Sequence, residues 1–97
     1  MDSITATLKS FKNNNNKVYL FGSRARNTNL KNSDVDVIII SNEFKNIPFR
    51  QRMDKYLDAW TLPYDLEILC YTPEEIERKK KEIGIVQTAL NESIEIT

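Results

Sequence analysis

The chain has 97 residues, of which 14 are Lys or Arg and 14 are Asp or Glu, so its formal net charge is zero. This length suits one domain with a modest core, and the balanced charge excludes a global field that would attract a polyanion such as nucleic acid. Histidine is absent, which excludes the commonest general base and the usual zinc ligand.

The cysteine content and the apolar patterning predict where the protein works. A single cysteine, Cys70, excludes an internal disulfide and is typical of a reducing cytoplasm. It lies within an apolar run, as a small core residue does. No apolar stretch approaches the ~20 residues that span a bilayer, and no signal-peptide pattern opens the chain. We therefore expect one cytoplasmic domain over residues 1–97.

The first predicted element is a helix, because Ile4, Leu8 and Phe11 recur at helical spacing. The asparagines at 13–16 favour a turn that ends this helix. An apolar run over 18–21 then predicts the first strand, which leads directly into a glycine and a serine.

The second predicted strand covers 34–40 and begins with two acids. Side chains at i and i+2 of a strand share a face, so Asp34 and Asp36 present two carboxylates side by side. Beyond Asp36 both faces are apolar, which predicts that the strand is covered on both sides there. The carboxylates are therefore expected where the strand emerges from the core.

The stretch 18–40 combines two kinds of binding group. Two adjacent carboxylates repel each other unless a cation lies between them, and oxygen ligands beside a phosphate are the usual setting for Mg²⁺. Just upstream, Gly22 lets the backbone approach a bound group closely, and the amides that follow and the Ser23 hydroxyl can donate to phosphate oxygens. The pattern predicts a phosphate site next to a metal site.

The segment 49–60 follows Pro48 and predicts one amphipathic helix. Its apolar positions, which we expect to pack in the core, are Phe49, Met53, Tyr56, Leu57 and Trp60. Arg52 lies on the opposite, polar face and is expected to be exposed to solvent.

The third predicted strand covers 64–71, and its acids Asp65 and Glu67 share one face. Thr72 and Glu75 then predict a capping box at the start of another helix.

The remaining segments are predicted to be structural. The basic run 78–81 is typical of a solvated helix end and favours a nucleic-acid patch much less. Gly84 is expected to end that helix. A short helix around 85–90 and an edge strand over 93–96 complete the prediction.

Two segments, GSRAR at 22–26 and SDVD at 33–36, resemble the signature of the DNA polymerase β-like nucleotidyltransferase superfamily. They are most similar to its small stand-alone members, the minimal nucleotidyltransferases. Many relatives carry glycine where this chain has Asn27, and asparagine tolerates a left-handed backbone better than most residues. The strand and helix order fits along nearly the whole chain.

The resemblance implies a mixed α/β (α+β) fold with a small twisted mixed sheet and helices mainly on one face. It also implies Mg²⁺-dependent transfer of a nucleoside monophosphate from a nucleoside triphosphate, with ATP expected, to an acceptor hydroxyl. Gly22 and Ser23 would hold the triphosphate. Arg24 or Arg26 would neutralise its charge, and Arg26 matches the motif position of the family.

The resemblance further implies that Asp34 and Asp36 hold two Mg²⁺ ions and that a neighbouring strand supplies a third acid. Asp65 and Glu67 are the candidates. Relatives often carry an acid five positions before the helix start, which is Glu67, and we favour it as ligand and as base for the acceptor. Asp65 remains a competitor, and one of the two acids could instead pair with an arginine of the 22–26 segment.

Members similar to this chain are typically paired with a helical HEPN-domain protein, often as a toxin–antitoxin couple. This implies an antitoxin that nucleotidylates its partner. The alternative is a binding module with a vestigial site that neutralises the partner by complex formation. The joint presence of Ser23, Asp34 and Asp36 favours the enzyme. A polymerase acting on nucleic-acid ends is disfavoured by the zero net charge, and a homo-oligomer remains open.

Overall fold

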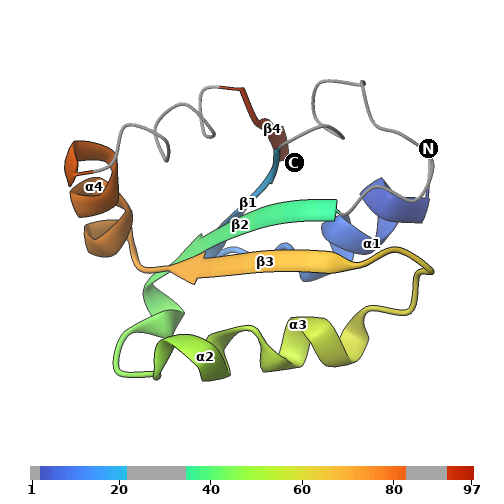
Figure 1. Ribbon diagram of the computed structural model, residues 1–97, viewed down its shortest axis with the longest axis horizontal. Coiled ribbons are helices and arrows are strands. Elements are labelled where there is room, and N and C mark those ends of the chain that lie inside the picture. Colours follow the sequence, from blue (N-terminus) through green and yellow to red (C-terminus); the bar gives the residue numbers. More distant parts are fainter. Residues whose placement is uncertain (1–2, 22–34, 83–91) are drawn as a thin grey trace.

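The computed structural model describes residues 3–21, 35–82 and 92–97. The predicted helix around 85–90 and Gly84 lie outside the described residues. The described elements follow in the order α1 (Ser3–Phe11), β1 (Asn16–Phe21), β2 (Val35–Ser41), the 3-10 turn η1 (Asn42–Phe44), α2 (Phe49–Arg52), α3 (Asp54–Ala59), β3 (Leu66–Tyr71), α4 (Pro73–Glu82) and β4 (Ile94–Ile96) (Figure 1).

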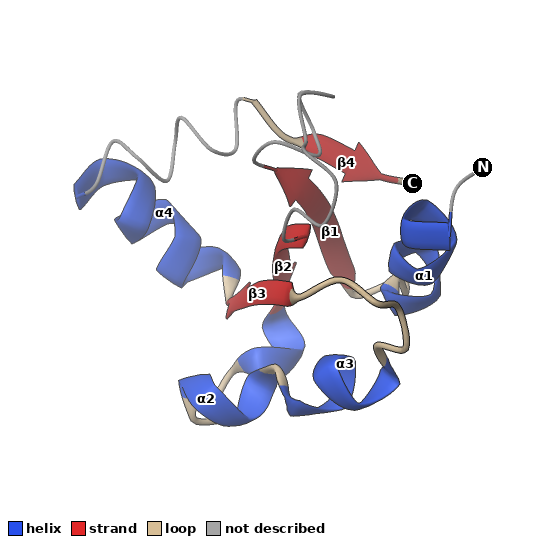
Figure 2. Ribbon diagram, turned by 45° about the vertical axis from the view of Figure 1, so that its right-hand side comes forward, coloured by secondary structure: helices blue, strands red, loops and turns tan. Residues whose placement is uncertain are grey.

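The strands form one four-stranded mixed sheet in the order β3-β2-β1-β4. Strand β1 is antiparallel to both β2 and β4, whereas β2 and β3 are parallel. The segment between the parallel strands contains α2 and α3 (Figure 2). This arrangement confirms the predicted mixed sheet, and β4 confirms the predicted edge strand.

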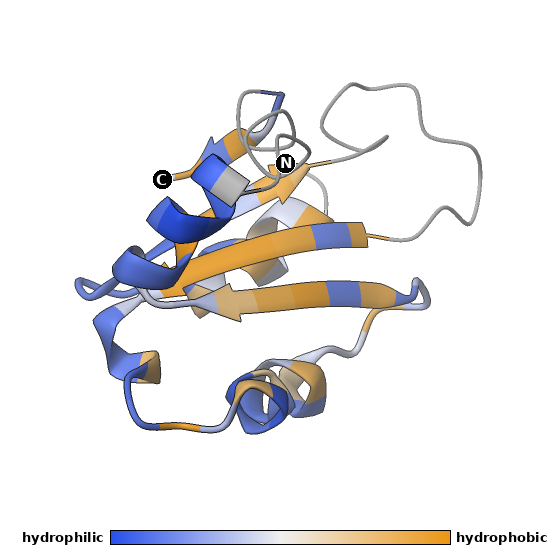
Figure 3. Cartoon of the chain, turned by 60° about the vertical axis from the view of Figure 1, so that its left-hand side comes forward, coloured by the Kyte–Doolittle hydropathy of each residue, from blue (hydrophilic) through white to orange (hydrophobic). Residues whose placement is uncertain are grey.

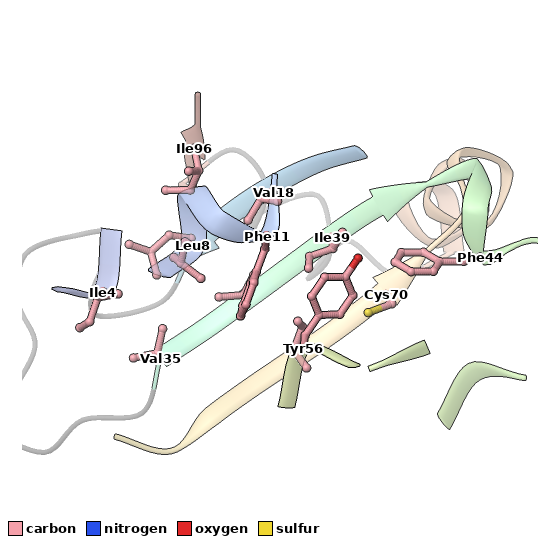
Figure 4. Packing of buried hydrophobic residues seen from close by; sticks show 13 residues of the cluster. Ile4, Leu8, Phe11, Val18, Val35, Ile39, Phe44, Tyr56, Cys70 and Ile96 are labelled. Carbon is pink, nitrogen blue, oxygen red and sulfur yellow. The ribbon is translucent and has the colours of Figure 1, made fainter. Parts of the chain in front are cut away.

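The larger core lies on the face of the sheet to which β2 turns its fully buried residues Val35, Val37 and Ile39 (Figure 4). Apolar side chains of α1 and α3 pack there, and Phe11 meets Tyr56 edge to face with ring centroids 5.1 Å apart. Burial of this kind supplies most of the stability of such a small domain.

The opposite face carries a smaller cluster of Ile38, Tyr71 and Ile76, the last from α4. Strand β2 is therefore covered on both sides beyond Asp36, as the run of apolar residues predicts. Since α1 and α3 cover one face and α4 the other, the helices do lie mainly on one face.

The start of α4 is the predicted capping box. The Glu75 main-chain N–H donates to Thr72 Oγ1 at 3.2 Å, and the Thr72 N–H donates to Glu75 Oε1 at 2.8 Å. These bonds satisfy main-chain donors that the first turn leaves without helical partners.

The prediction of one continuous helix over 49–60 is wrong, because the helix is interrupted at Met53 between α2 and α3. The prediction of an exposed Arg52 is also wrong, since only 8% of it is accessible. Its guanidinium donates to the carbonyl oxygens of Ile47 at 2.9 Å and Cys70 at 3.1 Å, and it pairs with Glu75. Arg52 thus holds α2 against the end of β3, while α3 packs on the larger core.

Candidate active site

Asp36 lies near the start of β2 with a strand on each side. Its register partner on β3 is Glu67 and its partner on β1 is Phe21. Partners in neighbouring strands project to the same face of a sheet, and the strands are separated by about 4.8 Å. Asp36 and Glu67 therefore place two carboxylates side by side, and β2 and β3 each show a hydrophilic band at this level in an otherwise hydrophobic strand (Figure 3).

Strand alternation explains why these acids face away from the larger core. Val35 and Val37 are fully buried on one face, so Asp36 between them turns to the other. On that face Ile38 is buried, Asp36 is half-buried and Glu67 is exposed. Asp36 therefore lies where β2 emerges from the core, as the sequence predicts.

The register distinguishes the two candidates for a third acid by position. Asp65 precedes β3, and its carbonyl oxygen accepts a hydrogen bond from the Val35 main-chain N–H at 2.8 Å. Glu67 is the residue directly opposite Asp36. This geometry supports Glu67, but the choice of ligand stays a prediction because Asp34 lies outside the described residues.

The other predicted site residues also lie outside the described part of the chain: Gly22, Ser23, Arg24 and Arg26. Strand β1 ends at Phe21, the residue before that motif, and Phe21 is paired with Asp36. The described end of β1 therefore lies beside Asp36, one residue before the glycine-serine motif.

The described carboxylates offer two of the ligands that a metal ion needs. Within residues 3–21, 35–82 and 92–97, no group of three or more His, Cys, Asp or Glu side chains could hold a metal ion. Asp36 and Glu67 nevertheless supply adjacent oxygen donors of the kind that Mg²⁺ prefers, and a cation would relieve their mutual repulsion. The described pair fits part of a magnesium site by its chemistry.

The apolar surface beside Glu67 was not predicted. Phe49 and Leu57 were expected in the core but are 39% and 40% exposed, and Leu69 is 36% exposed. A signal for Leu69 exists in the sequence, because it shares a strand face with the acids Asp65 and Glu67 and such a face is open to solvent. The exposure of Phe49 and Leu57 depends on the break at Met53 and on tertiary packing.

Comparisons with known proteins agree with the fold and with the family resemblance. A family model described as "Nucleotidyltransferase domain" matches residues 2–95. Among solved structures, a crystal structure described as a "putative nucleotidyltransferase from Sulfolobus solfataricus" is similar, with 25% sequence identity and a TM-score of 0.56. The match covers 77% of this chain and 70% of that one. No curated protein matches.

Proposed function

Because the chain belongs to the nucleotidyltransferase domain family, we propose that Asp36 and Glu67 belong to its active site. The family assignment makes the chain a transferase that acts on a nucleoside triphosphate. The observation that carries the site assignment is the register of β2 and β3, which sets Asp36 and Glu67 side by side on one face.

The proposal gives the motif residues separate roles. Gly22 and Ser23 hold the triphosphate through main-chain amides and a hydroxyl, and Arg26 neutralises its charge, with Arg24 as the second candidate. These roles rest on the resemblance of the 22–26 segment to the family signature. ATP is the proposed nucleotide.

Asp34, Asp36 and Glu67 would hold two Mg²⁺ ions, which supply charge neutralisation at the phosphates when bound. Glu67 also acts on the acceptor: its carboxylate takes the proton of the acceptor hydroxyl. The acceptor oxygen forms a bond to the α-phosphorus, and the bond between that phosphorus and the pyrophosphate oxygen breaks. The products are the nucleotidylated acceptor and pyrophosphate. Catalysis of this kind depends on positioning and charge stabilisation, so it needs no histidine.

Calorimetry with ATP tests the proposal. We expect weak binding in EDTA, because the carboxylates repel the triphosphate, and much tighter binding with Mg²⁺. Asp36→Asn should abolish the Mg²⁺-dependent part of ATP binding. The midpoint of thermal unfolding should stay unchanged or rise slightly, since the like-charge repulsion is relieved. Equal ATP binding with and without Mg²⁺ in the wild type would contradict the metal site.

The proposed acceptor is a hydroxyl on a helical HEPN-domain partner, and the proposed biological role is that of an antitoxin. The balanced charge of the chain supports a protein acceptor over nucleic acid. The single cysteine supports a cytoplasmic setting. No helix in the described ranges is long and apolar enough to cross a bilayer. The second candidate function is a binding module that neutralises the partner without transfer.

A further inference from the structure

The outer edge of β3 lies beside the proposed catalytic carboxylate. Strand β3 ends the sheet, and no described strand pairs with its outer side. The Asp65 carbonyl points to β2, where it accepts from Val35, so by strand alternation the main-chain groups of Leu66 and Ile68 point outward. Strands at such edges offer hydrogen-bonding groups to an added segment.

The surface along this edge is hollowed. One hollow of about 330 Å³ is lined by residues that include Phe21, Met53, Leu57, Glu67 and Leu69. It therefore reaches from the catalytic carboxylate to the exposed side of α3.

A second hollow of about 500 Å³ continues beyond Leu69, which lines both. Its other lining residues are Phe49, Tyr71, Glu75, Arg78 and Lys79. We call the two together the β3 trough. The described chain exposes few large apolar side chains, and three of them (Phe49, Leu57 and Leu69) line this trough. An exposed apolar patch of this kind marks an interaction surface.

The charges of the trough differ between its two ends. Glu67 lies at one end, while Arg78 and Lys79 lie at the other. Neither of these cations forms an ion pair with a described residue, whereas Glu75 is held by Arg52. The end away from the catalytic carboxylate can therefore attract an acidic side chain.

We propose that the β3 trough binds an extended segment of the acceptor protein and delivers its hydroxyl to Glu67. The inference rests on the proposed function, and it names the surface and the kind of segment that the transfer reaction uses. A segment that hydrogen-bonds to the Leu66 and Ile68 main chain lies about 4.8 Å from β3. Its side chains then alternate between the faces of the sheet.

This alternation sets a pattern for the segment. A Ser, Thr or Tyr beside Glu67 has its hydroxyl next to the base that accepts the proton, and the oxygen can then attack the α-phosphorus with release of pyrophosphate. The residue two positions along lies beside Leu69, where an apolar side chain can enter the hollow with Phe49 and Tyr71. An acidic side chain further along meets Arg78 and Lys79.

The test uses short synthetic peptides with one central Ser, Thr or Tyr and randomised flanks, together with Mg²⁺ and ATP labelled at its α-phosphate. We expect labelled peptides to be enriched in an apolar residue two positions from the hydroxyl. Leu57→Glu and Leu69→Asp should each lower peptide labelling about tenfold or more, because a charge replaces the apolar lining. Leu57 lies on the outside of α3, so Leu57→Glu keeps the test valid if Leu69→Asp fails to fold.

The matched control is Ile94→Asp. Ile94 is 48% exposed on β4, at the other edge of the sheet, so this variant adds the same charge to a different apolar site and should label peptides like the wild type. Thermal unfolding verifies that each variant is folded. Equal peptide labelling by the wild type and Leu57→Glu would overturn the inference.

Two other occupants give distinct results, and each would overturn the inference. A nucleic-acid acceptor would appear as labelling of a single-stranded oligonucleotide in place of the peptides. A second copy of the chain would appear in sedimentation as a dimer that Leu57→Glu dissociates. A wild type that binds ATP with Mg²⁺ but labels no peptide would overturn the trough alone, whereas a wild type that binds no ATP would overturn the proposed function.

Discussion

Asp36 and Glu67 are neighbours in the sheet, but their surroundings suit different tasks. Asp36 is half-buried between β1 and β3, so its carboxylate is held in place by strands on both sides. Glu67 is exposed on the edge strand and has one more methylene. A group that accepts a proton from a substrate must also release it to solvent, and this favours Glu67 as the base.

Glu67→Gln tests this assignment of the base. The substitution keeps the size of the side chain and removes the charge that holds a metal and accepts a proton. We expect nucleotide transfer to fall by ~10²-fold or more, the usual effect of losing a general base. The measurement is transfer of labelled AMP to the acceptor peptides.

Asp65→Asn is the matched variant, because Asp65 is the acid two residues before Glu67 and directly precedes β3. It should lower transfer far less than Glu67→Gln. If Asp65→Asn stops transfer while Glu67→Gln leaves it intact, the third ligand has been assigned to the wrong acid.

Cys70 allows a separate prediction. It is fully buried in the larger core, and burial raises the pKa of its thiol to about 12. Only the thiolate attacks a disulfide reagent, so the native protein should react at least ~10²-fold more slowly at pH 8 than the chain unfolded in denaturant. A stopped-flow assay with an aromatic disulfide measures both rates. Similar rates in the two states would show that Cys70 is accessible.

At the scale of elements, Arg52 connects α2, β3 and α4. Its guanidinium bonds to both oxygens of Glu75 and to the Cys70 carbonyl, and it lies 5.9 Å and 5.7 Å from the ring centroids of Phe44 and Phe49. Arginine is suited to such a site because its planar fork matches a carboxylate and stacks on aromatic rings. One wall of the β3 trough therefore depends on this ion pair.

Glu75→Gln tests the contribution of the pair to stability. Hydrogen bonds from Arg52, and then from the Thr72 main chain, lower the pKa of Glu75 from 4.5 to about 2. A lowered pKa in the folded state stabilises the protein above the unfolded pKa, and this stabilisation is lost as the pH falls from about 4.5 towards 2. We expect Glu75→Gln to lower the free energy of unfolding by about 2 kcal/mol at pH 7. Urea unfolding from pH 7 to pH 2 measures the effect.

The difference in the free energy of unfolding between the wild type and Glu75→Gln should become smaller as the pH approaches 2. Glu74→Gln is the control, because Glu74 is exposed in the same first turn of α4 and bonds to no described partner. It should change the free energy of unfolding by a few tenths of a kcal/mol at most. A constant difference between Glu75→Gln and the wild type over the whole pH range would contradict the ion-pair explanation.

Local patterns were enough to predict most elements. The apolar run after Asp36 predicted β2 and its two covered faces, and the spacing of Thr72 and Glu75 predicted the capping box. The burial of Arg52 could not be predicted, because it depends on a partner 23 positions away in the sequence. No pattern within 49–60 marks the break at Met53. The adjacency of Asp36 and Glu67 likewise required the register of two strands, which no local pattern specifies.

In the whole molecule, the proposed carboxylate site lies on the face of the sheet opposite the larger core. One face carries the larger core with α1 and α3, the other carries α4 and the carboxylates, and the β3 trough follows the outer edge of the sheet between the two. Since the site faces away from the larger core, acids there can be replaced without opening a cavity in that core. Asp36 does not line the β3 trough, so its substitution tests catalysis separately from binding in the trough.

Asp36→Asn in the presence of the partner decides between enzyme and binding module. The partner is the protein encoded next to the gene of this chain, which we expect to be helical, and the two are co-expressed. An enzyme transfers labelled AMP from ATP to that protein and lowers its toxicity. Asp36→Asn should then lower labelling ~10²-fold or more and restore toxicity, although a pull-down still recovers the complex.

Asp54→Asn, an exposed substitution on α3, serves as the control and should behave like the wild type. If the wild type binds and neutralises the partner without labelling it, and Asp36→Asn does the same, neutralisation depends on the complex alone.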